Sequence, residues 1–311
     1  MQTAQTMLAF EPVVLAERPD WVVVVGDVNS TIACALVAVK LGIHVAHVEA
    51  GLRSRDWSMP EEINRVLTDS ISSLLLTPSK DANANLQAEG ISGERVSFVG
   101  NVMIDSLHRF DHYTAQTNAL DEAGLRARQY GLVTLHRPSN VDDPDQLGSL
   151  LNAFDKIQEE IPLVFPVHPR TRKMMNDFGL MQRVDRMRQL RLLDPIGYKD
   201  FLQFERHALM VLTDSGGIQE ETTVFQVPCL TLRANTERPV TVEHGTNTVV
   251  GTDEHAIVCE ARNVIAGRGK TGRIPEGWDG HAASRIVNAI RGMSKETSAL
   301  AELSSTGANG R

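Results

Sequence analysis

The chain has 311 residues, 42% of them hydrophobic, and a formal net charge of −8. This length allows two ordinary domains with separate cores. The acidic balance argues against general nucleic-acid binding, which needs a basic surface, and no apolar stretch approaches the roughly 20 residues of a membrane helix. We therefore expect neither nucleic acid nor a membrane as a partner.

Residues 1–20 lack the basic region and apolar core of a signal peptide and are typical of the end of an amphipathic helix. The three cysteines, Cys34, Cys229 and Cys259, lie in apolar runs without CxxC spacing. An odd number of cysteines without such a framework predicts reduced, buried thiols in a cytoplasmic protein.

Short apolar runs alternate with helical patterns along the first third of the chain. The runs predict strands at 21–25, 44–48, 74–77 and 96–99, and the intervening patterns predict helices near 30–42, 60–73 and 79–89. Such alternation is typical of a parallel, doubly wound sheet. Residues 110–128 are polar and lack periodicity, which predicts a link between domains.

The alternation resumes after this link and continues nearly to the end. Strands are predicted at 132–135, 163–167, 209–212, 229–232 and 248–250, with helices between them, then a helix near 281–295 and a disordered tail. We expect an α/β protein with a first Rossmann-like lobe at 1–115, a second at 129–280, and a C-terminal helix and tail at 281–311. Ligands of open α/β sheets bind at the carboxyl ends of strands, so candidate residues are sought there.

The first lobe is expected to be incomplete. The run WVVVV at 21–25 is typical of a strand buried on both faces. Only a helix precedes it, so we expect the opening strands to be missing and this run to form an edge. An apolar edge strand is an aggregation hazard.

Two strands of the first lobe end in a carboxylate. Asp27 follows the strand at 21–25, and Glu49 follows the strand at 44–48. The structural alternatives are a helix cap for Asp27, because Asp is favoured at that position, and an ion pair with Arg53 for Glu49. Two carboxylates at neighbouring strand ends favour a functional site.

A third carboxylate, Glu61, opens the helix near 60–73. Ser58 and Glu61 fit a capping box, and Pro60 suits the first turn. Glu61, Asn64 and Arg65 also share one face of this helix and would make a polar surface suited to a cleft.

In the second lobe, His136 directly follows the strand at 132–135, and three carboxylates could face it across the cleft. The string DSGGIQEE at 214–221 follows a strand and opens a helix. Gly216 and Gly217 let the backbone approach a ligand, and the amides of a first helical turn attract phosphate. Glu221 lies one turn further in and can reach sugar hydroxyls. The alternative is a glycine-eased turn with an acidic first helical turn.

Arginines follow other predicted strands of this lobe. Arg170, Arg172, Arg233 and Arg238 lie after such strands and could supply cationic contacts to a pyrophosphate. Arginines at these positions are also ordinary solvated charges.

Together these strings resemble the non-hydrolysing UDP-N-acetylglucosamine 2-epimerases. The matching motifs, in the family's order, are GDVNST, HVEAGLRS, MPEEINR, VGNVMID, LHRPSN, FPVHPRTR, DSGGIQEE and TERPVTVEHGT. They cover nearly all of residues 18–251. The resemblance implies the GT-B fold, with the active site in the cleft between two lobes.

The resemblance also implies roles for individual residues. Asp27, Glu49, Glu61 and His136 match the family's catalytic positions. Ser215, Gly216 and Glu221 match residues that hold the phosphates and ribose of UDP. The full set expected to bind substrate is Arg53, Arg65, His168, Arg170, Tyr198, Ser215, Gly216, Gly217, Glu221 and Arg238.

The family's reaction is reversible inversion at C2 of the sugar, which converts UDP-N-acetylglucosamine to UDP-N-acetylmannosamine by loss and re-addition of UDP. We accordingly expect a cytoplasmic homodimer that needs neither metal nor other cofactor and supplies precursors of surface polysaccharide. Two alternatives stay open. One is an epimerase of a modified UDP-sugar, such as a 2,3-diacetamido uronate. The other is a non-catalytic UDP-sugar-binding remnant, because the GTRPE-type loop near the family's N-terminus has no counterpart here.

Overall fold

The structure is a computed structural model that describes residues 1–114 and 118–307. It contains two compact units: unit 1 comprises Met1–Asp105 and Glu276–Arg311, and unit 2 comprises Ser106–Pro275. This division differs from the one expected from the sequence, because the chain returns to unit 1 after residue 275. The C-terminal helix belongs to unit 1 since its apolar side chains pack on that unit's sheet.

Unit 1 is an α/β unit around one four-stranded parallel sheet, with strand order β1-β2-β3-β4. Its strands are β1 (Trp21–Val25), β2 (His44–Val48), β3 (Leu74–Thr77) and β4 (Val96–Phe98). Its helices are α1 (Gln2–Glu17), α2 (Asn29–Lys40), α3 (Pro60–Ile71), α4 (Lys80–Ala88), the short η1 (Gly93–Arg95) and α15 (Ala282–Gly307), and α5 (Val102–Thr114) begins here and continues into unit 2.

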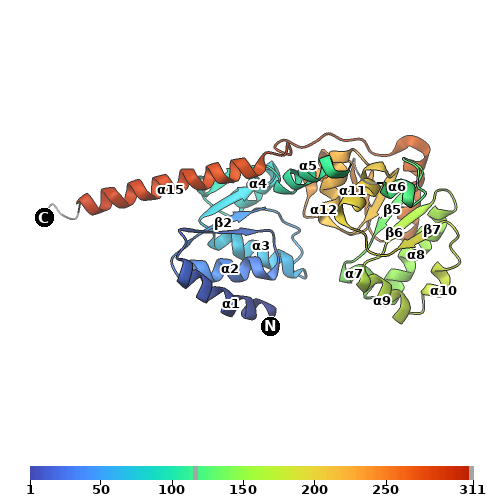
Figure 1. The fold of residues 1–311 in the computed structure, drawn as a ribbon, viewed down its shortest axis with the longest axis horizontal. Coiled ribbons are helices and arrows are strands. Elements are labelled where there is room, and N and C mark those ends of the chain that lie inside the picture. The colour runs from blue at the N-terminus through green and yellow to red at the C-terminus, as the bar shows by residue number, and fades with distance from the viewer. Residues whose placement is uncertain (115–117, 308–311) are drawn as a thin grey trace. The chain divides into compact units, whose positions relative to one another are not determined.

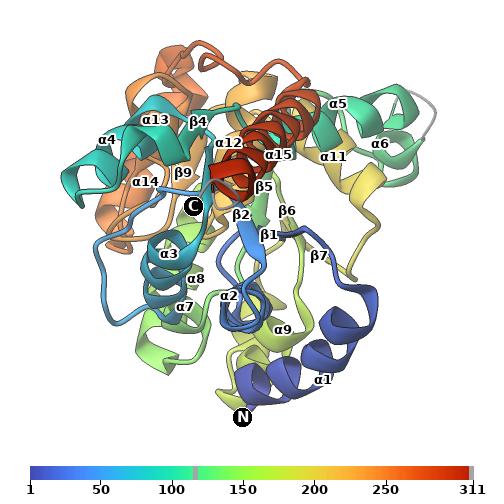
Figure 2. The ribbon, with the colours of Figure 1, turned by 90° about the vertical axis from the view of Figure 1, so that its left-hand side faces the viewer.

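Alternating side chains of the strands cover opposite faces of this sheet. Val22, Val24 and Val45 pack against α2 in one apolar cluster. Neighbouring positions, Ala46 and Val48, pack with α15 in another. In Figures 1 and 2, α1, α2 and α3 accordingly lie on the opposite side of β2 from α15. The period of two along a strand thus explains how both faces are covered.

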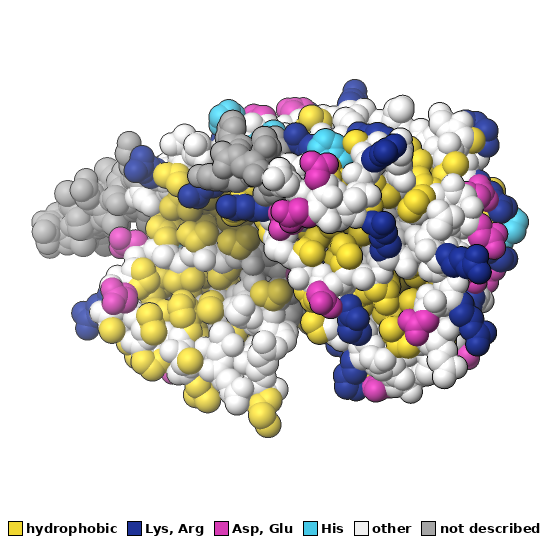
Figure 3. All heavy atoms as spheres, turned by 45° about the vertical axis from the view of Figure 1, so that its right-hand side comes forward, with side chains coloured by type: hydrophobic (Ala, Val, Ile, Leu, Met, Phe, Trp, Pro, Cys, Tyr) yellow, Lys and Arg dark blue, Asp and Glu magenta, His cyan; other side chains and the backbone are white. Residues whose placement is uncertain are grey.

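Strand β1 lies at the edge of its sheet, as the sequence predicted. It is not buried on both faces: Val23 and Val25 are 48% and 51% exposed. Figure 3 shows apolar side chains gathered on the surface of this unit. Val23 and Val25 form the kind of exposed apolar edge that favours pairing with other chains.

Unit 2 is built around a six-stranded parallel sheet with strand order β10-β9-β8-β5-β6-β7. Its strands are β5 (Gly131–Thr134), β6 (Leu163–Pro166), β7 (Leu190–Leu193), β8 (Met210–Thr213), β9 (Cys229–Thr231) and β10 (Asn247–Val249). Its helices are α6 (Ala119–Glu122), α7 (Pro138–Val141), α8 (Pro144–Gln158), α9 (Pro169–Asp177), α10 (Met181–Val184), α11 (Tyr198–His207), α12 (Gly216–Phe225), α13 (Pro239–Glu243), α14 (Glu254–Asn263) and η2 (Val264–Arg268).

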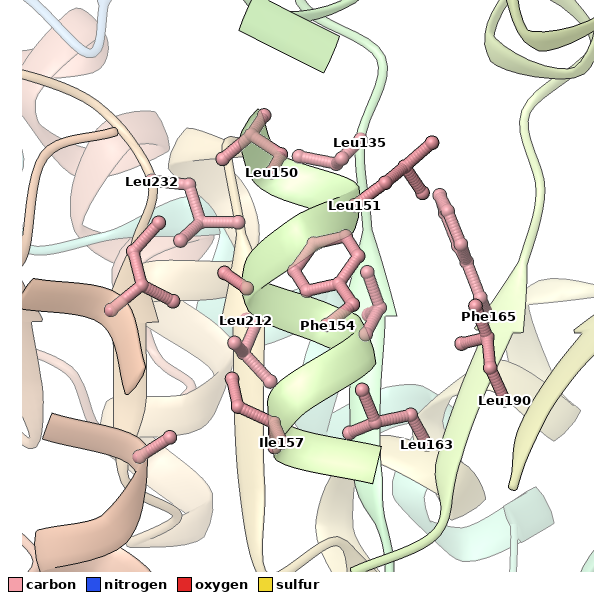
Figure 4. Packing of buried hydrophobic residues seen from close by; sticks show 14 of the residues in the cluster. Leu135, Leu150, Leu151, Phe154, Ile157, Leu163, Phe165, Leu190, Leu212 and Leu232 are labelled. Atoms are coloured by element: carbon pink, nitrogen blue, oxygen red, sulfur yellow. The ribbon is translucent and has the colours of Figure 1, made fainter. Parts of the chain in front are cut away.

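The core of unit 2 forms around α8, whose apolar face lies on the sheet. Figure 4 shows Phe154 and Ile157 of this helix among side chains of the strands. The ring of Phe154 meets that of Phe165 edge-on, with centroids 6.3 Å apart. This packing fixes the central strands, whose carboxyl ends carry the polar residues described below.

The structure corrects several expectations about elements. Strand β7 was missed because Arg191 interrupts its short apolar run. The polar segment 110–128 is not a plain link, since α5 extends to Thr114 and α6 follows; residues 115–117 lie outside the described residues. Helix α15 runs to Gly307, well past 295, and the expected disordered tail falls partly on residues 308–311, outside the described part.

The three cysteines are free, but only Cys229 is buried, while Cys34 is half-buried and Cys259 is exposed. The expectation of three buried thiols was therefore wrong for Cys259. Across the described parts of the chain, no helix combines the length and the apolar character needed to cross a membrane.

Candidate functional site

Asp27 stands at the carboxyl end of β1 and is held by α3. Arg65 pairs with it at 2.9 Å between Nη1 and Oδ2, and the side-chain amide of Asn64 donates to its carbonyl oxygen at 2.8 Å. The helix-cap alternative is wrong, because the N-cap residue of α2 is Val28. The Asp27 carboxylate is instead held in place by a buried arginine.

Glu49 follows β2 in a strained backbone conformation. Its φ is +69°, in the left-handed region that side chains other than glycine rarely adopt. A Cβ built on Gly26 would lie 3.5 Å from Glu49 Oε2, so this carboxylate lies against the turn after β1. Asp27 and Glu49 are therefore carried by adjacent turns. Strain at such a position is common where a side chain must be aimed at a ligand.

A buried hydrogen-bond network lies beneath these two turns. His47 contacts Asp69 Oδ1 at 2.6 Å through Nδ1 and the carbonyl oxygen of Gly26 at 2.9 Å through Nε2. Asp69 Oδ2 accepts from the amide of Gly51 at 3.0 Å. Burial opposes ionisation of Asp69, but hydrogen bonds and charges from His47 and Arg53 lower its pKa below the usual value. The network joins the turns that carry Asp27 and Glu49.

Arg53 belongs to this network. Its side chain is 2% exposed, lies 2.7 Å from Asp69 Oδ2, and bonds Glu89 through two nitrogens. The structure therefore places this guanidinium inside unit 1. His47 and Asp69 were not among the site residues predicted from the sequence. The available signal was a histidine within an apolar strand and an aspartate on the buried face of α3.

Glu61 lies half-buried in the first turn of α3. The capping-box alternative is wrong: the N-cap residue is Met59, and Ser58 Oγ donates instead to Asp56 at 2.6 Å. The neighbouring Glu62 is the structural carboxylate, because it accepts the amides of Ser54 and Arg55 at 2.9 Å each. Burial opposes its ionisation, but these hydrogen bonds and Arg65 lower the pKa of Glu62.

His136 in unit 2 is positioned by Asp214, at the end of the neighbouring strand β8. Its Nδ1 lies 3.0 Å from Asp214 Oδ1, and the backbone amides of His136 and Arg137 donate to the same carboxylate. Burial opposes ionisation of Asp214, but these hydrogen bonds and the charge of His136 lower its pKa. A proton on Nδ1 leaves Nε2 to face a ligand. Asp214 was not among the site residues predicted from the sequence.

Three predicted residues of unit 2 line one cavity of about 210 Å³: His136, His168 and Ser215. The two histidine rings have centroids 6.0 Å apart. Pro195, Phe201 and other apolar side chains form the rest of the wall. A small apolar cavity with convergent polar groups is a typical place for a ligand.

Helix α12 begins beside this cavity, with Ser215 as its N-cap residue. A Cβ on Gly216 would lie 2.6 Å from Arg238 Nη1, whereas one on Gly217 would meet nothing within 4 Å. Arg238 is held by Glu220 and Glu237 at 2.8 Å and 2.7 Å. Glycine at 216 therefore lets an arginine approach the start of the helix, where backbone amides favour anions.

Glu221 lies buried in α12, and the Tyr198 hydroxyl of α11 donates to its Oε1 at 2.5 Å. Burial and the adjacent Glu221 raise the pKa of Tyr198 well above its usual value. Arg170 lies apart from this group, exposed on α9 and paired with Asp142. The structure thus brings Tyr198 to Glu221 but does not bring Arg170 to the cavity.

Comparisons with known proteins agree with the motifs. The sequence profile of the UDP-N-acetylglucosamine 2-epimerase family matches residues 1–291. A UDP-N-acetylglucosamine 2-epimerase from Methanococcus maripaludis is 40% identical over 307 aligned residues, which cover 94% of this chain and 81% of the relative. A UDP-2,3-diacetamido-2,3-dideoxy-D-glucuronate 2-epimerase from Pseudomonas aeruginosa is 41% identical over 296 residues, covering 93% and 79%.

A solved structure is also similar over most of the chain. The crystal structure of the Methanocaldococcus jannaschii UDP-GlcNAc 2-epimerase, in complex with UDP-GlcNAc and UDP, matches with a TM-score of 0.84 and 41% sequence identity. The match covers 92% of this chain and 80% of that one. The parallel sheets and the strand-end residues described above, together with these matches, show that the chain belongs to the UDP-N-acetylglucosamine 2-epimerase family and has its GT-B type of fold.

Proposed function

We propose that this chain interconverts UDP-N-acetylglucosamine and UDP-N-acetylmannosamine by inversion at C2. The observation that carries the proposal is the similarity of the chain to an epimerase whose crystal structure contains UDP-GlcNAc and UDP. The two sequences are 41% identical, and the match covers 92% of this chain. Three half-buried carboxylates in unit 1 and an arginine-flanked helix start in unit 2 support it.

In this proposal unit 2 binds UDP. The first-turn amides of α12 and the guanidinium of Arg238 contact the pyrophosphate, with Ser215, Gly216 and Gly217 allowing close approach. Glu221 accepts the ribose hydroxyls. His136 and His168 contact the ligand from the cavity wall, while Tyr198 lies toward the uridine.

We assign the proton transfers to Asp27, Glu49 and Glu61 as a set. The C2 proton passes to a carboxylate, its bonding electrons form a C1–C2 double bond, and the C1–O bond breaks with its electron pair leaving on UDP. The 2-acetamidoglucal then takes a proton at C2 on the opposite face while UDP returns to C1. Two proton-handling groups are needed, which explains a cluster of carboxylates. Arg65 and Arg53 act in this scheme by holding the cluster and its turns in place.

Unit 2 residues stabilise the leaving group. Negative charge develops on the departing pyrophosphate, and preorganised amides and an arginine lower the energy of that charge. His136, fixed by Asp214, presents Nε2 to the same region of unit 2. The product is an activated amino sugar, so we also propose that the chain supplies precursors of surface polysaccharide. We further propose that it works as a homodimer.

The test is to incubate the purified chain with UDP-N-acetylglucosamine in D₂O and follow it by NMR. We expect UDP-N-acetylmannosamine to form with deuterium at C2. A ¹⁸O label in the sugar–phosphate bridge should scramble into the β-phosphate, because the C1–O bond breaks and re-forms. Turnover without scrambling would overturn the elimination route.

The chain could fail to convert this substrate and yet convert UDP-2,3-diacetamido-2,3-dideoxy-glucuronate in a parallel sample. That result would overturn the proposed sugar but support the proposed epimerisation at C2. A folded chain that binds UDP and converts neither sugar would overturn the proposed activity.

A further inference from the structure

A second buried carboxyl group lies against Glu221. Glu205 of α11 is 0% exposed, and its two carboxyl oxygens have no hydrogen-bond donor within the described residues. An ionised carboxylate in such a place lacks compensation and is costly. The proposed function gives Glu205 no role, so its presence needs an explanation.

The contact between the two carboxyl groups requires a shared proton. Glu205 and Glu221 lie within hydrogen-bonding reach of each other. Ionised carboxylates only accept hydrogen bonds, so one of the two must be protonated. Burial, the charge of Glu221 and this hydrogen bond raise the pKa of Glu205 well above its usual value. Burial raises the pKa of Glu221 as well, but the Tyr198 hydroxyl donates to its Oε1 at 2.5 Å, which favours the charged form. Because Tyr198 supplies a donor to Glu221 and no described residue supplies one to Glu205, we place the proton on Glu205.

We propose that Glu205 is a positioning residue for a ligand with a vicinal diol: it donates a hydrogen bond to Glu221 and thereby holds that carboxylate, between Glu205 and Tyr198, ready to accept the ribose hydroxyls. This inference rests on the proposed function, in which Glu221 contacts the ribose of UDP. A carboxylate has about four acceptor positions, so two donors from the protein leave room for the diol.

The surroundings of the pair make a second ionisation costly. The groups that act on it are the Tyr198 hydroxyl from α11 and the Cys229 thiol from β9. Burial raises the pKa of Cys229 to about 12. Neither group is a cation. Loss of the Glu205 proton at alkaline pH would place two negative charges side by side and disturb Glu221.

Two substitutions separate positioning from simple filling of space. Glu205→Gln keeps the shape and an N–H donor for Glu221 but has no proton to lose. Glu205→Met fills a similar volume and cannot donate. If Glu205 only fills space, both variants behave alike. If it positions Glu221, only Glu205→Met fails.

The experiment measures binding of UDP and 2′-deoxy-UDP by titration calorimetry from pH 6 to 9.5. The ratio of the two affinities reports the diol contact, because titration of the phosphates is common to both ligands. A hydrogen bond to a charged group predicts a ratio of roughly 10 to 100 for the unmodified chain near pH 7. We expect this ratio to be kept in Glu205→Gln and to be near one throughout in Glu205→Met.

Circular dichroism checks the fold of each variant, because 2′-deoxy-UDP keeps the 3′-hydroxyl that Glu221 also accepts. A Glu205→Met variant that keeps the ratio of the unmodified chain would overturn the inference. A ratio of one in the unmodified chain would overturn it too, while leaving the epimerase proposal intact. Absence of any UDP binding would overturn both.

Discussion

Strands β1 and β5 both end in a candidate residue, yet they lie in different surroundings. β1 is an edge strand with one neighbour, β2, and its Val23 and Val25 are about half exposed. β5 lies between β8 and β6, and its Val133 is fully buried. Two similar apolar runs, one at the edge of a sheet and one in its interior, therefore each carry a candidate site residue.

The difference appears in what holds each candidate residue. His136, after the interior strand, is fixed by Asp214 from the end of the adjacent strand β8. Asp27, after the edge strand, is fixed by Arg65 and Asn64 of α3. A central strand end is thus supported by the sheet itself, whereas an edge strand end depends on a helix and a buried ion-pair network. Substitutions in the two units can test this contrast.

The largest effect is expected from Glu49→Gln. The amide keeps the shape but cannot accept a proton, so turnover should fall roughly 10²–10⁴-fold. UDP affinity should be nearly unchanged, because UDP is assigned to unit 2. Turnover by the NMR assay and UDP titration measure the two effects. Glu94→Gln, an exposed carboxylate of the same unit, is the control, and near-normal turnover in Glu49→Gln would show that its role is structural.

Arg65→Met should destabilise unit 1. The change leaves the buried Glu62 and the partly buried Asp27 without their cation, and breaking a buried pair in this way costs about 3–5 kcal/mol of unfolding free energy. Urea unfolding followed by circular dichroism measures it. Arg291→Met, at an exposed position of α15, should change little. Equal stability of the two variants would mean that the helix does not support the edge strand.

Asp214→Asn tests the support that β8 gives to His136. The variant loses charge-assisted hydrogen bonds worth about 1.5–3 kcal/mol at neutral pH. Because the folded-state pKa of Asp214 is lowered, its contribution is present above the unfolded-state value of about 3.9 and is lost as pH falls through the folded value. Melting temperatures should therefore converge with those of the unmodified chain on acidification. A constant difference down to pH 2 would contradict this assignment.

The sequence predicted much of this contrast but not the means of support. Strand positions and strand-end carboxylates follow from local patterns of apolar residues, and nine of the ten strands within residues 1–114 and 118–307 could be placed in this way. The partners of Arg53 could not, because Asp69 lies in α3 and Glu89 directly follows α4, and these two segments meet only in the folded unit. Likewise, the pattern could not show that Glu62 rather than Glu61 would be the buried structural carboxylate.

A smaller effect is expected at the start of α12. In Gly216→Ala the new methyl group would crowd Arg238 and Glu237, which are side-chain ends and can shift. We expect UDP affinity to fall roughly 5- to 10-fold, about 1 kcal/mol, without loss of fold. Gly217→Ala adds its methyl group to open space. A loss of UDP affinity in this variant would therefore show that the ligand itself occupies that space. Equal affinities of Gly216→Ala and the unmodified chain would show that the close approach of Arg238 is not needed.

The smallest change in stability is expected from Val23→Lys on the edge strand. Val23 is 48% exposed, so a lysine there keeps its charge in water, and the unfolding free energy should change by no more than about 0.5 kcal/mol. The same charge should discourage pairing of β1 with other chains. Analytical ultracentrifugation over a range of concentrations should therefore show less association than for the unmodified chain.

The matched substitution in the interior strand, Val133→Lys, places an ammonium group in the buried core of unit 2, and that unit should fail to fold. We expect Val133→Lys to lose UDP binding and Val23→Lys to bind UDP normally. One binding assay would then show that the interior strand and the edge strand tolerate a lysine differently. If Val23→Lys were as damaging as Val133→Lys, β1 would have to be covered in solution, since a lysine at an open edge has no reason to disrupt the fold.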